Sequence, residues 1–464
     1  MGAMYPLDPK PDDMRAMGEA VVDYLVAFVQ GLDDAPAEGT EGGIEVARSL
    51  RAAPPELGGD FDPIFEDVKL AATKAYEYAG PGYLAYIPGG GLYTAALAEF
   101  FAQGVNRYIN LWQPSPAMVQ IEQNVVRWLC DLFDYPEEAR GLLTSGGSMA
   151  NFSAIVTARH DRLGADFLDG TYYVSEQVHA SVSKAANLAG FSERNLRLVA
   201  TDRELRMDAE ALRDMVRADR AAGLRPFLVV PSAGTTNTGA IDPLDAIADV
   251  ARDEELWMHV DAAYGGFYQL TERGRERFRG IERADSVTLD PHKGMFLPYG
   301  IGSLVVRDGA ALRDAHYEGA AYLQVLAPEG ELPNFTEYSP ELSRANRGLR
   351  VWIPLKLHGV SAFRESLDEK LDLAAYLDDA LAAIPELELP WRPQVTVVPF
   401  RLADGDDDVN ARFLQRINAS KRVFLSSTVI HGRYTLRACI QCHRTHRDRI
   451  DECIEIVRAA AAEA

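Results

Sequence analysis

The chain has 464 residues, 47% of them hydrophobic and 25% charged, which is ordinary for a globular protein and long enough for one large domain with smaller ones beside it. It carries 47 Lys and Arg against 69 Asp and Glu, and the formal charge of −22 argues against nucleic acid and anionic membranes as partners. No apolar run approaches the length of a membrane span, and the N-terminus lacks the basic start and apolar centre of a signal peptide, so we expect a cytoplasmic protein.

The N-terminal part predicts a helix followed by an extended arm. Over residues 13–30, apolar side chains recur at steps of three and four residues, which is the stripe of an amphipathic helix. The stretch that follows, through Gly59, is rich in Pro, Gly and Glu, which favours an arm lying over another surface such as a partner subunit. We therefore assign residues 1–91 to an N-terminal helical segment that makes dimer contacts.

From about residue 92, helical stretches alternate with short apolar runs such as 227–230 (FLVV) and 256–260 (LWMHV). This alternation predicts a large α/β domain over residues 92–348, with a mostly parallel sheet covered by helices. After residue 348 the chain is first strongly helical and then strand-like, which predicts a small C-terminal α+β domain over residues 349–464.

The cysteines are too sparse for a disulfide framework, and we expect all four to be reduced: Cys130, Cys439, Cys442 and Cys453. Cys439 and Cys442 form a C-x-x-C pair, but apolar residues alternate around them as in a strand. The pattern favours a buried strand over a zinc or redox site, and no metal is expected.

Two chemically useful side chains follow predicted strands. Asp261 comes directly after the run 256–260 and Lys293 follows SVTLD, so both would lie where ligands bind in open α/β sheets. A desolvated lysine amine forms a Schiff base with an aldehyde. Taken alone, each has an ordinary explanation, because Asp261 could start a loop and Lys293 could be a solvated loop lysine.

Three further segments offer groups for an anion and a ring. The Gly-rich turn in TSGGSMANFS opens a predicted helix, whose free N–H groups and dipole favour a phosphate, although capping by Ser148 would also explain it. Thr235 and Thr236 follow the 227–230 strand, where their hydroxyls bind an oxyanion or satisfy a turn. His179 is a lone histidine, which alone would be read as structural.

Combined in one domain, these groups meet the needs of pyridoxal phosphate (PLP). The cofactor requires a lysine for its aldehyde and a cradle for its phosphate. It also requires a carboxylate for its pyridine nitrogen and a flat group to stack on its ring.

The segments HVDAAY, DPHK and GTT, with the intervals between them, resemble the group II PLP-dependent decarboxylases, the family of aromatic L-amino acid decarboxylase. The resemblance implies the PLP-dependent transferase fold type I, PLP as cofactor, and a homodimer with active sites at the subunit interface. It makes Lys293 the Schiff-base lysine, Asp261 the partner of the pyridinium nitrogen and His179 the ring-stacking residue. The other implied cofactor contacts are Gly147, Ser148, Thr236, Ala263 and His292.

The resemblance also implies where the amino acid substrate binds. Tyr86 and Gly89 match the segment near the substrate carboxylate, where the aromatic decarboxylases usually have Thr in place of Gly89. Tyr108, Asn110 and Trp112 match the segment that lines the side-chain pocket, often across the dimer interface. Asn110 stands where an aromatic residue is common.

Residues 316–337 are polar and punctuated by Gly and Pro, which predicts a loop that closes over the substrate. Within it, Tyr322 aligns with the catalytic-loop tyrosine of the family, which protonates the carbanion left after CO₂ departs. Tyr338 is the alternative donor, and each tyrosine would otherwise be a surface aromatic.

The resemblance implies PLP-dependent decarboxylation of an L-amino acid, with an aromatic substrate favoured, to the amine and CO₂. The alternatives are a decarboxylase of a non-aromatic amino acid and an aldehyde synthase that couples decarboxylation to oxidative deamination. The family associates the aldehyde synthases with loss of the loop tyrosine or the stacking histidine, so Tyr322 and His179 favour simple decarboxylation. The DPHK and HVDAAY segments disfavour transamination and C–S cleavage, and the complete set of cofactor residues disfavours a non-enzymatic binding protein.

Overall fold

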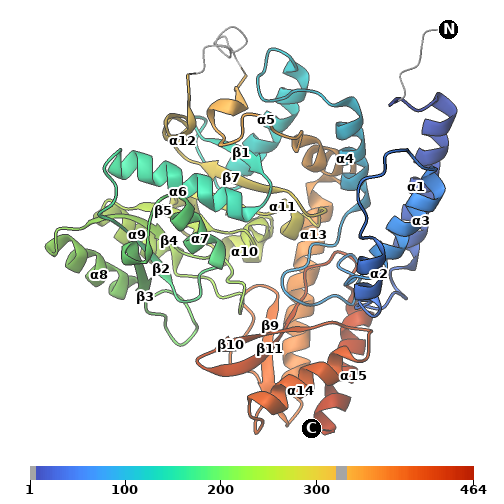
Figure 1. The fold of residues 1–464 in the computed structure, drawn as a ribbon. Helices are drawn as coiled ribbons and strands as arrows, with labels where there is room; N and C mark the ends of the chain where they lie inside the picture. Colours follow the sequence, from blue (N-terminus) through green and yellow to red (C-terminus); the bar gives the residue numbers. More distant parts are fainter. Residues whose placement is uncertain (1–6, 320–331, 464) are drawn as a thin grey trace.

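The computed structural model describes residues 7–319 and 332–463, and a seven-stranded sheet forms its centre (Figure 1). The strand order is β1-β7-β6-β5-β4-β2-β3. The strands are β1 (Arg140–Thr144), β2 (Gly170–Ser175), β3 (Leu196–Val199), β4 (Arg225–Val230), β5 (Trp257–Asp261), β6 (Ser286–Leu289) and β7 (Gly302–Val306).

Most neighbours in this sheet run parallel, and only β7 is antiparallel to the strands beside it. The parallel register pairs Val229 with Met258 and Val260 with Val287. The apolar run 227–230 lies within β4, and residues 257–260 of the second run lie within β5, as the sequence predicted. The α/β fold with a mostly parallel sheet is confirmed, and it is the fold type I architecture.

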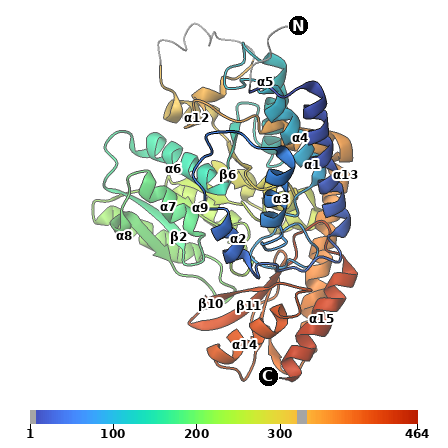
Figure 2. The same cartoon turned by 45° about the vertical axis from the view of Figure 1, so that its right-hand side comes forward.

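Helices cover both faces of the sheet, because successive strand residues point to opposite sides (Figures 1 and 2). On one face, α6 (Gly147–Leu163), α7 (Ala180–Leu188) and α12 (Gly309–His316) bury one apolar cluster. The other face is covered mainly by α5 (Pro116–Asp131), α8 (Ala209–Ala221) and α9 (Leu244–Asp253). Shorter helices in the same domain are α4 (Tyr93–Val105), α10 (Glu272–Arg277) and α11 (Pro291–Gly294).

A second, antiparallel sheet lies in the C-terminal part, in the order β10-β11-β9-β8. Its strands are β8 (Leu387–Glu388), β9 (Val397–Leu402), β10 (Ser426–Ile430) and β11 (Arg433–Cys439). The helices α14 (Asp407–Asn418) and α15 (Arg447–Ala462) pack on it, together with the long helix α13 (Gly348–Ala382), which bends at Gly359 where φ is 77°. Four buried free thiols include Cys439 at the end of β11.

The N-terminal segment contacts the C-terminal sheet. The N–H of Leu84 donates to the carbonyl of Phe424 at 3.0 Å, and the N–H of Ala37 donates to that of Lys421 at 2.8 Å. Leu84 is fully buried in the C-terminal apolar cluster. The N-terminal segment therefore shares a core with the C-terminal sheet, and the domain limits at residues 91 and 348 stay a prediction.

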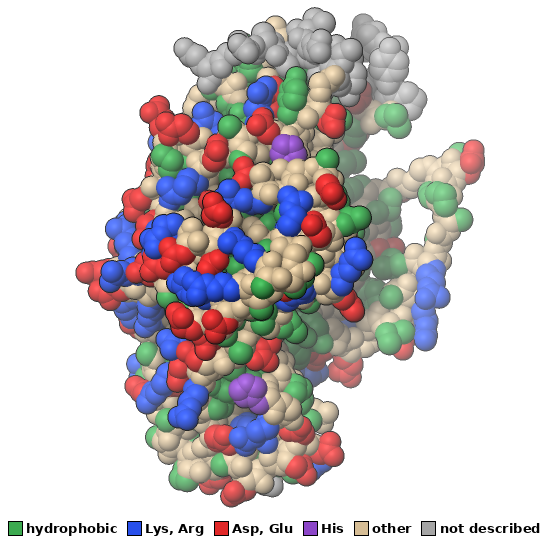
Figure 3. Space-filling view, turned by 90° about the vertical axis from the view of Figure 1, so that its left-hand side faces the viewer, with side chains coloured by type: hydrophobic (Ala, Val, Ile, Leu, Met, Phe, Trp, Pro, Cys, Tyr) green, Lys and Arg blue, Asp and Glu red, His purple; other side chains and the backbone are tan. Residues whose placement is uncertain are grey.

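The helices α1 (Pro11–Gly31), α2 (Gly43–Ser49) and α3 (Phe61–Ala72) form an arm at one side of the molecule and bury none of their residues completely (Figures 1 and 2). On the opposite side, basic and acidic side chains are interspersed (Figure 3). Arginines of α8 pair there with acids that end α9, for example Arg217 with Glu254 at 3.0 Å. Among the described helices, none has the length and apolarity needed to cross a membrane.

Candidate active site

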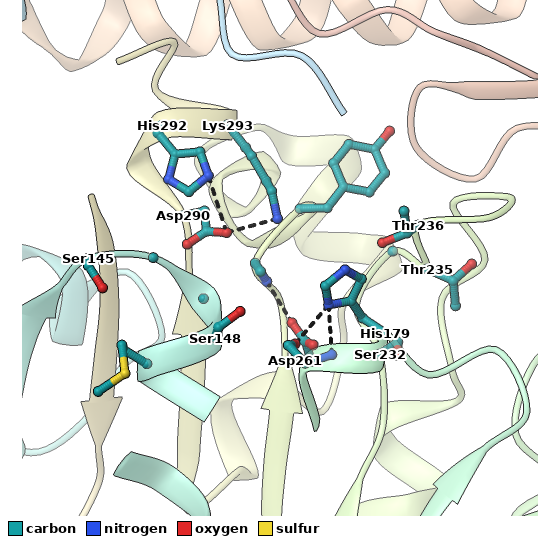
Figure 4. Close-up of a pocket in the computed structure, with 17 residues that line it drawn as sticks. Ser145, Ser148, His179, Ser232, Thr235, Thr236, Asp261, Asp290, His292 and Lys293 are labelled. Atoms are coloured by element: carbon teal, nitrogen blue, oxygen red, sulfur yellow. Dashed lines mark hydrogen bonds and ion pairs between the residues drawn. The ribbon is translucent and has the colours of Figure 1, made fainter. Parts of the chain in front are cut away.

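One cavity of about 270 Å³ opens at the carboxyl ends of β1, β2, β4, β5 and β6, where the loops that follow these strands meet (Figure 4). Parallel strands bring their carboxyl ends to the same edge of a sheet, and ligands of open α/β folds bind at that edge. All the residues that the sequence predicted around the cofactor line this cavity: Gly147, Ser148, His179, Thr236, Asp261, Ala263, His292 and Lys293.

Lys293 lies in the short helix α11, directly after β6, and its amine faces the cavity (Figure 4). Its Nζ is 2.8 Å from Oδ2 of Asp290, which begins the same helix turn. The other oxygen of Asp290, Oδ1, is buried and has no hydrogen-bond partner among the described residues. The sequence motif DPHK contained Asp290, but only its histidine and lysine were assigned roles, so this contact was missed.

Asp261 ends β5, and its buried carboxylate accepts two hydrogen bonds. The backbone N–H of Ala263 donates to Oδ1 at 3.2 Å, and the amide of Asn151 donates to Oδ2 at 3.1 Å. Asp261 forms no ion pair with another described residue, although it is only 7% exposed. A buried carboxylate without a cation fits a ligand that brings its own positive charge, such as a protonated ring nitrogen.

The N-terminus of α6 faces the same cavity. Gly146 precedes the helix, and the N–H groups of Gly147 and Ser148 have no acceptor in the described part of the chain. A Cβ on Gly147 would approach Oδ2 of Asp290 to 3.0 Å and Cβ of Ala263 to 3.2 Å, so glycine keeps this approach open. Free N–H groups at the start of a 17-residue helix form a site for a phosphate.

His179 and His292 are held in defined orientations. His179 begins α7, and its Nδ1 accepts a hydrogen bond from the backbone N–H of Ser181, so the ring is fixed at the cavity wall. Nδ1 of His292 donates to the carbonyl of Ile301, and Nε2 is 3.6 Å from Oδ2 of Asp290. Burial lowers the pKa of His292, which favours a neutral ring whose Nε2 is an acceptor.

The predicted substrate residues do not line this cavity. Tyr86 has a side chain that is 58% exposed and a backbone with φ of 52°, and its carbonyl accepts from Arg437 at 2.9 Å. A Cβ at Gly89 would lie 2.1 Å from the carbonyl oxygen of His292. Only glycine therefore allows this close approach between the 86–91 segment and the segment that carries Lys293.

The second predicted substrate segment is anchored to residues 334–344. Asn110 is buried, and its amide donates to the carbonyl of Leu342 at 2.6 Å while its Oδ1 accepts from the N–H of Arg344 at 3.1 Å. The N–H of Trp112 donates to Oδ1 of Asn334 at 3.2 Å, and Tyr108 is 42% exposed. The roles of these residues in substrate binding stay predictions.

The two loop tyrosines differ in what the structure describes. Tyr322 lies outside the described residues. Tyr338 is half-buried and packs against the apolar cluster that includes α6 and α12, away from the cavity lining.

Two residues outside the sequence predictions connect the cavity to its surroundings. Asn151 projects from α6 and donates to Asp261, four residues after Gly147 and therefore near the same helix face. Arg437 of β11 donates to the carbonyls of Tyr86 and Thr236. The spacing within α6 was a usable signal for Asn151, whereas nothing local to β11 pointed to Arg437.

The arrangement as a whole fits PLP. An amine lies beside a carboxylate, a second buried carboxylate has no cation, and a helix start offers free N–H groups around the same cavity. An aldehyde, a protonated ring nitrogen and a phosphate are the groups that such a set would hold.

Comparisons with known proteins agree with this fit. Residues 45–403 match the model of the family described as the pyridoxal-dependent decarboxylase conserved domain. The chain is 33% identical over 462 residues to an aromatic-L-amino-acid decarboxylase of Bacillus atrophaeus, covering 97% of this chain and 96% of the relative. It is 26% identical over 471 residues to a phenylacetaldehyde synthase of Arabidopsis thaliana, covering 97% and 96%. A crystal structure of Oryza sativa TDC with PLP and tryptamine superposes with a TM-score of 0.93 at 25% identity, over 99% of each chain.

Proposed function

The chain belongs to the pyridoxal-dependent decarboxylase family and is a PLP-dependent amino acid decarboxylase, and we propose that its substrate is an aromatic L-amino acid. The matched residues 45–403 include every residue of the cavity wall. The 33% identical relative is named for aromatic L-amino acids, which supports the choice of substrate class. The single observation that carries the substrate class is the name of this relative, whereas the cavity in which the Lys293 amine, the Asp261 carboxylate and the α6 N-terminus meet supports the cofactor.

In the proposed mechanism, the amine of Lys293 would hold the cofactor, and it points into the cavity where the amino acid substrate would meet it. When bound, PLP supplies an aldehyde for that amine and a ring that accepts the electron pair left on the substrate carbon when CO₂ departs. Asp261 would stabilise the positive charge of the ring nitrogen, because it is buried and forms no ion pair with another described residue. Asp290 holds the Lys293 amine at 2.8 Å and so keeps it pointed into the cavity.

The remaining cofactor contacts have separate tasks. The N–H groups of Gly147 and Ser148 bind the phosphate at the start of α6. Both His179 and Ala263 line the cavity, where His179 would stack on one face of the ring and Ala263 would touch the other. Thr236 and His292 line the same cavity and position the ring within it.

Proton delivery to the substrate Cα is assigned to Tyr322, with His179 assisting. This assignment rests on the resemblance of the AAYLQ segment to the catalytic loop of the family, since Tyr322 lies outside the described residues. Tyr338 is the less favoured donor, because it packs against an apolar cluster.

We further propose that the protein is a cytoplasmic homodimer in which both subunits build each active site. The arm of α1 to α3 buries none of its residues completely, and α4 exposes Leu97, Phe100 and Phe101 by 47%, 66% and 53%. Apolar surface of this kind marks a protein interface. Tyr86, Gly89, Tyr108, Asn110 and Trp112 would then contribute to the substrate pocket from one or both subunits.

An aldehyde synthase is the second candidate, because one relative is named phenylacetaldehyde synthase. The two activities differ in the fate of the substrate carbon after CO₂ leaves. His179 and Tyr322 are both present, which favours the decarboxylase, because the family associates the synthases with loss of one of these two residues.

The experiment is to incubate the PLP-loaded protein with a panel of L-amino acids while following CO₂, amine, aldehyde and peroxide together. We expect CO₂ and amine in equal amounts from Tyr, Trp, Phe or a hydroxylated relative. Formation of aldehyde with stoichiometric peroxide would instead assign the protein as an aldehyde synthase. Turnover of a non-aromatic amino acid alone would refute the proposed substrate class.

A further inference from the structure

We propose that Asn151 is a positioning residue whose buried amide holds the Asp261 carboxylate and, through Ser181, fixes the proton of His179 on Nε2. The inference rests on the proposed roles of Asp261 and His179 and adds a shared origin for the hydrogen-bond roles of both side chains. It follows from a hydrogen-bond chain that runs behind the cavity, from β5 and β6 through α6 to the start of α7.

Asn151 occupies the branch point of this chain and is completely buried. Its Nδ2 donates to Oδ2 of Asp261 at 3.1 Å and to Oγ of Ser181 at 2.9 Å. Its Oδ1 accepts from Nε2 of His259 at 3.0 Å and from Oγ1 of Thr288 at 2.9 Å. Both amide hydrogens and both carbonyl lone pairs are therefore used, which leaves the side chain one orientation.

The carboxylate of Asp261 sets the direction of the chain. An ionised carboxylate only accepts hydrogen bonds, so the NH₂ group of Asn151 must face Asp261 and its oxygen must face His259. Burial lowers the pKa of His259 to about 4, so this ring carries one proton at neutral pH. That proton is on Nε2, where it is donated to Asn151.

The far end of the chain agrees with this direction. Nδ1 of His259 is left as an acceptor, and Oγ of Ser286 lies 2.8 Å from it. Ser286 in turn accepts from the indole N–H of Trp257 at 2.9 Å, and an indole N–H can only donate. The hydrogen-bond chain thus begins at the indole N–H of Trp257, which can only donate. One of its branches ends at the Asp261 carboxylate, which accepts.

The other branch fixes His179. Because Oγ of Ser181 accepts from Asn151, its own hydrogen is free to point at Nδ1 of His179, 2.7 Å away. The backbone N–H of Ser181 also donates to Nδ1, at 3.3 Å. With two donors on Nδ1, the ring proton resides on Nε2, on the side of the ring that faces the cavity (Figure 4). His179 therefore presents a hydrogen-bond donor to whatever occupies the cavity.

The consequence is that one amide controls both residues. Two donated hydrogen bonds, from Asn151 and from the N–H of Ala263, keep Asp261 in the acceptor form that a ring N–H needs. If the amide were inverted or removed, Ser181 would lose its donor and its hydroxyl would be free to turn, which leaves only the longer 3.3 Å bond from the backbone N–H of Ser181 to hold the His179 tautomer.

The test combines nitrogen NMR of histidine-labelled protein with titration of PLP into the apo form. Asn151→Asp keeps the shape but replaces the donating NH₂ by an oxygen that faces two acceptors. We expect the His179 signals, assigned by their loss in His179→Gln, to shift from a single Nε2–H form toward a mixture of both tautomers. The dissociation constant of PLP should rise by about tenfold, because one charge-assisted hydrogen bond to Asp261 is lost and a second carboxylate is placed beside it.

Two further variants keep the test decisive. Ser181→Ala removes only the hydroxyl between Asn151 and His179 and keeps the longer 3.3 Å bond from the backbone N–H, so a measurable Nδ1–H fraction should appear even if Asn151→Asp does not fold. Thr288→Val removes a bond to Asn151 Oδ1 outside the proposed path, and should keep the wild-type tautomer and a PLP dissociation constant within about twofold of wild type. An unchanged His179 tautomer in Ser181→Ala, or a wild-type protein with the proton on Nδ1, would overturn the inference. Failure of the wild type to decarboxylate any amino acid would instead refute the proposed function. The His179 nitrogen signals would still report the tautomer, because they do not depend on activity.

Discussion

Replacing Arg437 by Met should weaken cofactor binding more than its distance from the reacting atoms suggests. Arg437 lies in β11 and is 3% exposed. Its Nη2 donates to the carbonyls of Thr236 at 2.6 Å and Tyr86 at 2.9 Å. Its Nε donates to the carbonyl of Asn237 at 3.2 Å, and its Nη1 donates to Oγ of Ser426 at 2.9 Å. One guanidinium thus joins the N-terminal segment, the cavity loop and the C-terminal sheet.

The magnitude follows from opposing contributions. Each hydrogen bond to the cation contributes about 1.5–3 kcal/mol, and each buried carbonyl left without a donor costs about 1–3 kcal/mol. Arg437 forms no ion pair with another described residue, so Met also removes the cost of burying an unpaired cation, which is several kcal/mol. We expect a net loss of about 3 kcal/mol in the free energy of unfolding. If half of that loss falls on the cavity loop, the PLP dissociation constant rises by about tenfold.

Arg401→Met provides the matched control. Arg401 is also 3% exposed and also donates to carbonyls, those of Tyr434 and Gly405, but its partners lie within the C-terminal sheet and its loops. Urea unfolding and fluorescence titration with PLP, both on apo protein, separate stability from binding. Both variants should lose stability, and only Arg437→Met should lose PLP affinity. Equal PLP affinity in the two variants would show that Arg437 does not position the cavity loop.

Three shorter predictions use other parts of the structure. Lys293→Ala should abolish the absorbance band of lysine-bound PLP, and a variant that keeps the band would rule out Lys293 as the cofactor lysine. His259 has a folded pKa of about 4 against 6.5 in the unfolded chain, so the unfolded state binds more protons between these values and stability falls as pH drops through them. The loss should be about 2 kcal/mol from pH 7 to pH 5 by urea unfolding, and His259→Gln should lack that pH-dependent component. Phe100→Glu on α4 should shift the protein toward monomer in light scattering, and an unchanged dimer would remove α4 from the proposed interface.

Local patterns were sufficient for the sheet and for the groups around the cofactor. The apolar runs that became β4 and β5 are continuous because parallel strands are buried on both faces. Asp261 and Lys293 follow such runs directly, so their common location needed only the rule that parallel strands end at one edge. Asn151 and Arg437 were missed because their partners are long-range: 110 residues separate Asn151 from Asp261, and 351 separate Arg437 from Tyr86.

Gly89 shows how a residue that departs from a family pattern can be explained by packing. The usual Thr would place a Cβ 2.1 Å from the carbonyl oxygen of His292, so in this chain the absence of a side chain lets the 86–91 segment meet the segment that carries Lys293. Asn110 has a similar explanation, since both ends of its amide bind the backbone at Leu342 and Arg344. Its polarity therefore serves a buried backbone contact, as buried polar groups require, and is not evidence against an aromatic substrate. Under the proposed homodimer, other residues at the subunit interface would select the substrate side chain, so substitutions there should change specificity.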